Sequence, residues 1–193
     1  KKILILAGGH SKEKEISLKT AKAVFKQIKN NYNCKILDLK NGFIRQIRKF
    51  KPNTVFNALH GRFGEDGFIQ TYLESKGIRY THSGVLSSMM AMDKEISKKL
   101  FIKNKIKTPK FFTYSYDITK TNLIKKINKE LRFPVVIKPM NEGSSVNVYI
   151  SNKKNLDKIL RKLKDYKKVL IEEFIGGREI QVAIMGNKKL GAI

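Results

Sequence analysis

The sequence predicts an α/β protein in two parts, a parallel sheet covered by helices and then an α+β segment with antiparallel hairpins. Over residues 1–92, short apolar runs alternate with helical patterns and Gly-containing turns, which is typical of a parallel sheet. Thr108-Pro109 marks a break, because proline disfavours helix at the residue before it. Most of the chain beyond it reads as strands. We therefore expect two domains, 1–92 and 93–193.

Four apolar runs in the first part are predicted strands, and the patterns between them are helical. The first run is preceded by two lysines and followed by Gly-Gly, so we interpret it as a buried strand and not as a signal peptide. The helix after it repeats its apolar residues every three or four positions. The predicted strands are Lys2–Ala7, Lys35–Leu39, Thr54–Leu59 and Arg79–His82; the helical face is Leu18, Ala21, Val24, Phe25 and Ile28, and further helices cover about 66–75 and 85–90.

The second part begins with a helix near residues 93–104 and continues with strands and two further helices. Two strands are expected to pair around Gly143-Ser144-Ser145, and two around Gly176-Gly177. The predicted strands are Lys110–Tyr114, Pro134–Pro139, Asn147–Ser151, Val169–Phe174 and Glu179–Met185, and the predicted helices are Asn122–Leu131 and Leu156–Tyr166.

Composition excludes several classes of protein. A hydrophobic fraction of 41% is too high for a disordered chain, and lysine or arginine interrupts every apolar run, so we expect no membrane span. The net charge of +25 suggests nucleic acid, but the basic residues are spread over polar helix faces, and we expect no nucleic acid partner; a cationic nucleic-acid-binding module is kept as an alternative. Cys34 is the only cysteine, which favours a reducing, cytoplasmic location.

Two candidate sites follow strands of the first part. Gly8-Gly9 allows a tight turn before a helix, where the Glu13 carboxylate could hold a ligand ammonium; alternatively, Glu13 only offsets the helix dipole. The segment 59–67 holds three glycines, two carboxylates and His60 at the carboxyl end of a strand, where ligands of such sheets bind. A purely structural hydrogen bond of His60 is the alternative.

Two more candidate sites lie in the second part. Lys138 ends an apolar strand and precedes the Gly143-Ser144-Ser145 loop, so it needs an anion, and phosphate is the obvious candidate. In segment 170–182, alternation lets two carboxylates point to one pocket beside an apolar wall, which suits adenine and ribose; a solvated edge is the alternative. The carboxylates are Glu172 and Glu179, and the wall is Phe174 and Ile175.

Taken in order, these motifs resemble the D-alanine–D-alanine ligases of the ATP-grasp superfamily. The resemblance lies in Gly-Gly-x-Ser-x-Glu-x-Glu-Ile-Ser-Leu, His-Gly-x-x-Gly-Glu-Asp-Gly-x-x-Gln and Met-Asp-Lys at Lys94, then in Lys138-Pro139, Glu-Gly-Ser-Ser-Val and Ile-Glu before Glu179. It implies an α/β fold with an amino-terminal Rossmann-like parallel-sheet domain and an incomplete α+β ATP-grasp domain. It also implies joining of two D-alanine molecules with ATP through an acyl phosphate, for peptidoglycan precursor synthesis.

The resemblance assigns roles residue by residue. It implies that Glu13 binds the ammonium of the first D-alanine, with His60 and Ser144 beside the substrates as catalytic residues. The cofactor-binding residues it implies are Lys94 and Lys138 on the ATP phosphates under the Ser144-Ser145 loop, Glu172 on the adenine amino group, Phe174 and Ile175 beside the ring, and Glu179 on the ribose.

The sequence also departs from the family pattern. His82 and Asn147 stand where glycine is usual, and residues 180–193 contain no Asp or Glu. We therefore expect a truncated chain with no metal site of its own, whose Mg²⁺ or Mn²⁺ ligands lie in a missing carboxy-terminal part, and which alone releases no phosphate from ATP. The resemblance implies a homodimer. The alternatives are a D-alanine–D-lactate or D-alanine–D-serine ligase, or a non-catalytic nucleotide-binding fragment.

Overall fold

The computed structural model describes residues 1–40 and 42–192, and its first sheet is built around β1 (Lys2–Ala7). β1 pairs in parallel with β2 (Asn33–Asp38) on one side and β3 (Thr54–Asn57) on the other, and β4 (Arg79–Tyr80) extends the sheet in the order β2-β1-β3-β4. The predicted parallel sheet is confirmed. β1 has the predicted bounds, β2 begins two residues earlier and ends one residue earlier than predicted, and β3 and β4 each end two residues earlier.

Alternation along β1 divides its side chains between the two faces of the sheet. Ile5 and Ala7 pack with the apolar side of α1 (Lys14–Ile28), whereas Leu4 and Leu6 pack on the opposite face. That face is covered by α2 (Phe43–Phe50) and α3 (Phe68–Ser75). β1 is therefore buried on both sides, as a central strand of a parallel sheet must be.

Helix α2 was missing from the sequence prediction. It is only eight residues long, and Ile47 is its one buried residue. The helical signal was present in Phe43, Ile47 and Phe50, which recur at i, i+4 and i+7 and pack on the first sheet. Three basic residues within this short run obscured it.

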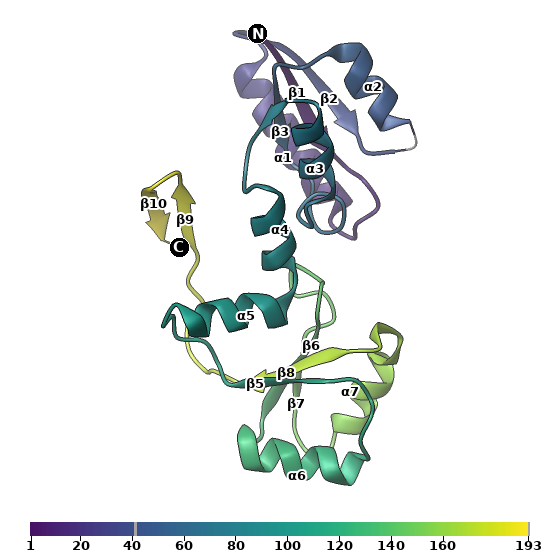
Figure 1. The fold of residues 1–193 in the computed structure, drawn as a ribbon, viewed down its shortest axis with the longest axis vertical. Helices are drawn as coiled ribbons and strands as arrows, with labels where there is room; N and C mark the ends of the chain where they lie inside the picture. The colour runs from purple at the N-terminus through teal and green to yellow at the C-terminus, as the bar shows by residue number, and fades with distance from the viewer. Residues whose placement is uncertain (41, 193) are drawn as a thin grey trace.

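Two helices connect the first sheet to the second (Figure 1). α4 (Val85–Met92) leads directly into α5 (Lys94–Lys103), and Asp93 lies between them. The Asp93 carboxylate accepts hydrogen bonds from the backbone N–H groups of Glu95 and Ile96 at 2.9 and 3.0 Å, which is a typical N-cap. The chain therefore turns sharply at Asp93 and starts a new helix across the second sheet.

The second sheet is antiparallel, in the order β5-β8-β6-β7. Its strands are β5 (Phe111–Tyr114), β6 (Val135–Pro139), β7 (Tyr149–Ser151) and β8 (Val169–Glu173). α6 (Lys120–Glu130), α7 (Leu156–Lys162) and the 3₁₀ turn η1 (Lys164–Tyr166) complete this part, and α6 and α7 bury Leu123, Ile127, Leu156 and Ile159 against the sheet. β6 and β7 form a hairpin around Gly143-Ser144-Ser145, as predicted.

The predicted hairpin around Gly176-Gly177 is wrong. β8 already has β5 and β6 as neighbours on its two sides, so no edge of it is free for β9 (Val182–Met185). β9 instead pairs with β10 (Lys188–Ala192) through the two-residue turn 186–187, and Figure 1 shows this ribbon apart from both sheets. The apolar pattern of residues 188–193 also predicts a strand without partners; β10 instead pairs with β9, and residue 193 lies outside the described residues.

No helix in the described part of the chain combines the length and apolar character needed to cross a membrane.

Candidate active site

One group of candidate residues, Lys94, Lys138 and Glu172, lies between α5 and the second sheet. Alternation places Val135 and Ile137 of β6 in the core below the sheet, so Lys138 points to the other face. On β8, Glu172 lies opposite Val136, two residues from Lys138, which puts both side chains on the face that α5 crosses. Strand register therefore brings Lys138 and Glu172 together.

Glu172 is buried, and both of its carboxylate oxygens contact lysine side chains. Oε1 contacts the Lys138 ammonium, and Oε2 accepts a hydrogen bond from Lys98 Nζ at 2.7 Å. Lys98 lies on α5, so this helix is tied to β8 through a residue for which the sequence analysis had no role. Its position was nevertheless readable, because Lys98 follows Lys94 by four residues and therefore lies on the same side of the helix.

Lys94 begins α5 and points to the loop that follows β6. Its Nζ donates to the backbone carbonyls of Met140 and Glu142, and the Met140 bond is 3.3 Å long. Burial lowers the pKa of the Lys94 ammonium, and the nearby positive charge of Lys138 lowers it further, against the opposing pull of Glu142, Asp93 and Glu172. An anion between Lys94 and Lys138 would relieve this repulsion.

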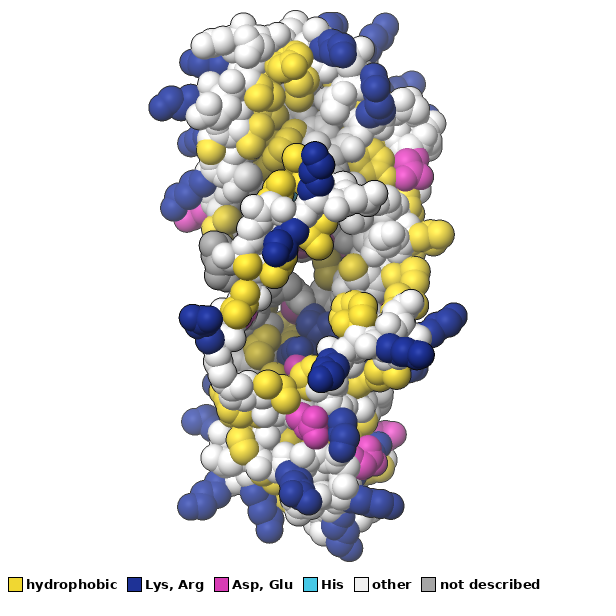
Figure 2. Space-filling view, turned by 90° about the vertical axis from the view of Figure 1, so that its left-hand side faces the viewer, with side chains coloured by type: hydrophobic (Ala, Val, Ile, Leu, Met, Phe, Trp, Pro, Cys, Tyr) yellow, Lys and Arg dark blue, Asp and Glu magenta, His cyan; other side chains and the backbone are white. Residues whose placement is uncertain are grey.

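Lys94, Lys138 and Glu172 line one cavity of about 390 Å³ between α5 and the sheet. Ala91, Ser97, Lys98, Phe101, Thr108 and Pro109 form the rest of its wall. The space-filling view shows the molecule hollowed between its two parts, with basic and acidic side chains visible inside (Figure 2). Three of the residues proposed from the sequence for nucleotide binding therefore share one pocket.

The other four residues proposed for the nucleotide, Ser145, Phe174, Ile175 and Glu179, are not part of this wall. Phe174 and Ile175 follow β8 directly and are 42% and 65% exposed. Glu179 is exposed in the segment before β9. The expected convergence of Glu172 and Glu179 on one pocket rested on the Gly176-Gly177 hairpin, which does not form, so the structure does not bring these two carboxylates together.

The loop after β6 reaches across to the first part of the chain. Ser144 Oγ donates a hydrogen bond to Glu13 Oε1, although 131 residues separate the two in sequence. Ser144, Ser145 and Asn147 all have positive φ, at 44°, 59° and 55°. The loop is therefore tightly turned. Ser145 is exposed and directly follows Ser144, which makes the hydrogen bond to Glu13.

His60 lies at the carboxyl end of β3 and lines the largest of the described cavities, about 540 Å³. Its Nδ1 is 3.7 Å from Glu65 Oε1, and Glu65 Oε2 accepts a hydrogen bond from the backbone of Gly61 at 2.7 Å. Gly143 borders the same cavity, and a Cβ on it would stand about 4 Å from the carboxylates of both Glu13 and Glu65. The three residues expected beside the substrates therefore surround one region between the two parts of the chain.

His82 also lines this cavity, which bears on its departure from the family pattern. It has a φ of +79°, its Nδ1 is 2.9 Å from Thr81 Oγ1, and its ring meets Phe56 edge-on. Its side chain is exposed overall, so it stands at the rim rather than in the floor.

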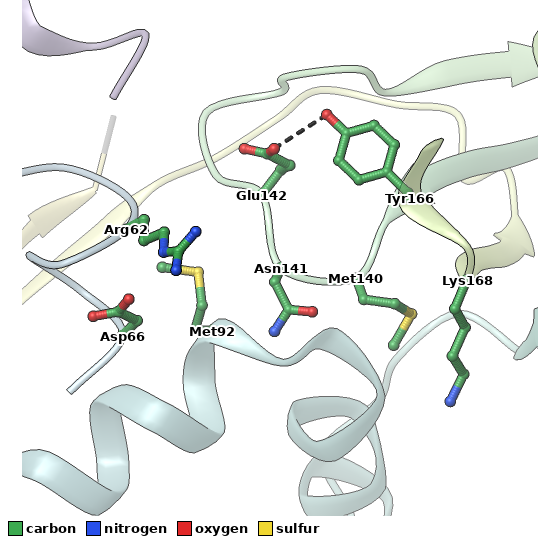
Figure 3. A pocket seen from close by; sticks show the side chains of 8 residues that line it. All are labelled: Arg62, Asp66, Met92, Met140, Asn141, Glu142, Tyr166 and Lys168. Atoms are coloured by element: carbon green, nitrogen blue, oxygen red, sulfur yellow. Dashed lines mark hydrogen bonds between the residues drawn. The ribbon is translucent and has the colours of Figure 1, made fainter. Parts of the chain in front are cut away.

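A further cavity of about 400 Å³ is lined by the first three residues of the loop after β6, Met140, Asn141 and Glu142 (Figure 3). Arg62, Asp66 and Met92 line it from the first part and α4, and five residues that include Glu142 and Tyr166 line it from the second. Tyr166 Oη donates to Glu142 Oε1 at 3.1 Å and accepts from Asn147 Nδ2 at 2.6 Å. The base of the loop is thereby fixed to η1, a link the sequence analysis missed.

Comparisons with known proteins show which proteins this chain is similar to. Residues 100–193 match the family model described as "D-ala D-ala ligase C-terminus". The whole chain is 61% identical to a D-alanine--D-alanine ligase of Pelagibacter ubique (strain HTCC1062) and covers 64% of that protein. In structure, 99% of the chain matches the D-alanine--D-alanine ligase of Bacillus anthracis with a TM-score of 0.86 and 35% identity, and 63% of that protein is covered.

The same Bacillus anthracis enzyme has also been solved as a complex with ATP, and the match there has a TM-score of 0.84. The chain spans somewhat less than two thirds of the length of these relatives. Sequence similarity along the whole chain and similarity of fold agree, and both agree with the order of the motifs. Along its whole length this chain is similar to part of the D-alanine–D-alanine ligases.

Proposed function

We propose that this chain forms the ATP-binding and first-substrate-binding part of an enzyme that joins two D-alanine molecules. The names of its relatives, of which it spans less than two thirds, support this activity. The expected compartment is the cytoplasm, the expected assembly is a homodimer, and the expected use of the dipeptide is in peptidoglycan precursors. The compartment is inferred from the single cysteine, and the assembly and the use of the dipeptide are inferred from the resemblance of the motifs.

The meeting of Lys94, Lys138 and Glu172 in one cavity is the observation that carries the proposal. Two ammonium groups suit a polyphosphate, and a buried carboxylate is a hydrogen-bond acceptor for the amino group of adenine. Burial and then the neighbouring charge of Lys138 lower the pKa of Lys94. This supports an anion there, since bound phosphate would offset the repulsion between the two ammonium groups. We therefore propose that ATP binds in this cavity, with Phe174, Ile175 and Glu179 on its adenosine side.

The first D-alanine is proposed to bind between Glu13 and His60, below the Ser144-Ser145 loop. The Glu13 carboxylate, which accepts a hydrogen bond from Ser144, is suited to hold an ammonium group. The amino acid's carboxylate would attack the γ-phosphorus of ATP and release ADP. The amine of a second D-alanine would then attack the carbonyl carbon of the acyl phosphate, lose its proton and expel phosphate. The chain's contribution is positioning and neutralisation of negative charge.

Phosphoryl transfer from ATP commonly uses Mg²⁺, and Mn²⁺ can replace it. The described residues contain no group of three His, Cys, Asp or Glu side chains that could hold a metal ion. No side chain among residues 1–40 and 42–192 is therefore proposed as a metal ligand.

Titration of the purified protein with ATP tests the proposed nucleotide site. We expect Lys138→Ala and Glu172→Ala each to raise the dissociation constant of ATP by about 10-fold or more, because each removes a charged contact. Glu130→Gln, on the exposed side of α6, removes a carboxylate far from the cavity and should leave the constant unchanged. A wild-type protein that binds duplex DNA but no ATP would contradict the proposal.

The chemistry is tested by product analysis. The complete enzyme of which this chain is proposed to form a part is incubated with ATP, Mg²⁺ and D-alanine, alone or with D-serine or D-lactate, and the products are separated by chromatography. D-Alanyl-D-alanine is the expected product wherever turnover occurs, and a mixed product formed in preference to it would indicate one of the two alternative ligases.

A further inference from the structure

Lys98 is almost completely buried at the back of the proposed nucleotide cavity, an unusual position for a lysine. Its Nζ donates to Glu172 Oε2 and to Thr108 Oγ1, both at 2.7 Å, and lies 5.0 Å from the centre of the Phe111 ring. Only 7% of the Lys98 side chain and 8% of the Glu172 side chain are exposed. Neither group can exchange its partner for water without a structural change.

Lys138, the second partner of Glu172, is in a different situation. Its side chain is 22% exposed, three times as much as that of Lys98, and it borders the cavity on the side of Lys94. If Lys138 turns toward the phosphates of a nucleotide, it must weaken its contact with Glu172. A buried carboxylate that loses its only cation is strongly destabilised. Glu172 avoids this because Lys98 remains.

We propose that Lys98 is a positioning residue for nucleotide binding, which holds the Glu172 carboxylate in place while Lys138 moves to the phosphates. The inference rests on the proposed function, since it assumes that ATP occupies this cavity. The two lysines have different roles: the buried Lys98 is a permanent partner of Glu172, and the more exposed Lys138 is an exchangeable one.

The different roles of Lys98 and Lys138 affect which nucleobase the site prefers. A fixed, ionised carboxylate accepts a hydrogen bond from the amino group of adenine, whereas it repels the carbonyl oxygen that guanine presents at the same position. Without Lys98, Lys138 would be the cation left to Glu172 and would stay bound to it. The carboxylate would then be less available to the amino group of adenine, and its preference for adenine should decrease.

The test measures the dissociation constants of ATP and GTP for the protein with Lys98→Met, a substitution of similar length without charge. We expect ATP binding about 10-fold weaker and the GTP-to-ATP ratio of dissociation constants several-fold smaller than in the wild type. Lys99→Met is the matched control: it removes the same charge from the same helix, but Lys99 is 66% exposed and pairs with Glu95. It should leave both constants unchanged.

A double-substitution cycle separates positioning from mere packing. If Lys98 acts through Glu172, Lys98→Met should have little further effect on ATP binding in protein that already carries Glu172→Gln. Melting temperatures without nucleotide are measured for every variant, and Lys98→Gln, which keeps a hydrogen-bond donor, replaces Lys98→Met if the latter does not fold.

The outcomes are distinct. Wild-type protein that fails to bind ATP would overturn the proposed function and this inference with it. Normal ATP binding by the wild type together with an unchanged ATP constant and base preference in the Lys98 variants would overturn the inference alone. So would full additivity of the Lys98 and Glu172 substitutions.

Discussion

Ser17 joins helix α1 to two turns that border the candidate site. Its hydroxyl donates to the backbone carbonyl of Ala58 at 2.6 Å and accepts from the backbone N–H of Gly8 at 2.8 Å, and the side chain is fully buried. Both partners lie next to strand ends, after β1 and after β3. The serine of the Glu-Ile-Ser motif is therefore a structural residue that holds the start of α1, and with it Glu13, near these turns.

Replacement of Ser17 by alanine is expected to lower the free energy of unfolding by ~1–3 kcal/mol, because two buried backbone groups lose their partner. Urea denaturation followed by circular dichroism measures the change. Ser75→Ala is the control, since that exposed hydroxyl only bonds the carbonyl of Tyr72 in its own helix. Equal effects of the two substitutions would show that the Ser17 hydrogen bonds contribute nothing specific.

At the scale of elements, the loop between β6 and β7 connects the two parts of the site. Ser144 touches Glu13 at the tip of the loop, and Asn147 and Tyr166 hold its base. The resemblance implies glycine at the position of Asn147, and asparagine tolerates the observed φ of 55° better than most residues with a side chain. Its amide donates a hydrogen bond to Tyr166 that glycine could not make.

We expect Asn147→Ala to destabilise the protein more than Asn147→Gly. Alanine loses the hydrogen bond to Tyr166 and keeps a strained backbone that costs ~1–2 kcal/mol, whereas glycine loses the same bond but adopts the positive φ freely. Denaturant unfolding of the three proteins measures their free energies of unfolding. The values for the wild type and for the glycine variant should both be higher than the value for the alanine variant. An alanine variant as stable as the glycine variant would contradict the role given to the backbone.

At the scale of the whole molecule, the sequence contains 41 basic and 16 acidic residues. Figure 2 shows lysine and arginine side chains distributed over both ends of the visible face. An even positive field attracts any anion, whereas a nucleotide site is local. The two effects respond differently to salt, because ions screen exposed charges within about 10 Å at 0.1 M but affect buried pairs less. Salt dependence therefore separates the proposed function from the nucleic-acid alternative.

Raising NaCl from about 0.05 to about 0.5 M should abolish binding of duplex DNA but weaken ATP binding only by a few-fold, since DNA contacts release many counterions and ATP carries few charges. Fluorescence anisotropy of labelled DNA and calorimetry of ATP supply the two curves. Parallel loss of both would show that ATP is held by the general charge of the surface and not in a defined cavity.

The sequence alone determined the local features of this protein. Most strands, the β6–β7 hairpin and the order of the motifs were readable from it, as were seven of the eight helical segments, including η1, in the part of the chain that the structure describes. They were readable because apolar periodicity, glycines and prolines act over a few neighbouring residues. Glu13, His60 and Lys138 stood out for the same reason, as polar groups beside strand ends. Helix α2 escaped because its apolar face is only three residues long.

Tertiary structure decided which of these pieces meet. β8 lies between β5 and β6, so it could not pair with β9, and Glu179 did not join Glu172. The contacts of Lys98 with Glu172, of Ser144 with Glu13 and of Asn147 with Tyr166 join residues 74, 131 and 19 positions apart. Such contacts depend on strand order and on how one helix crosses a sheet, and no local pattern of residues encodes either.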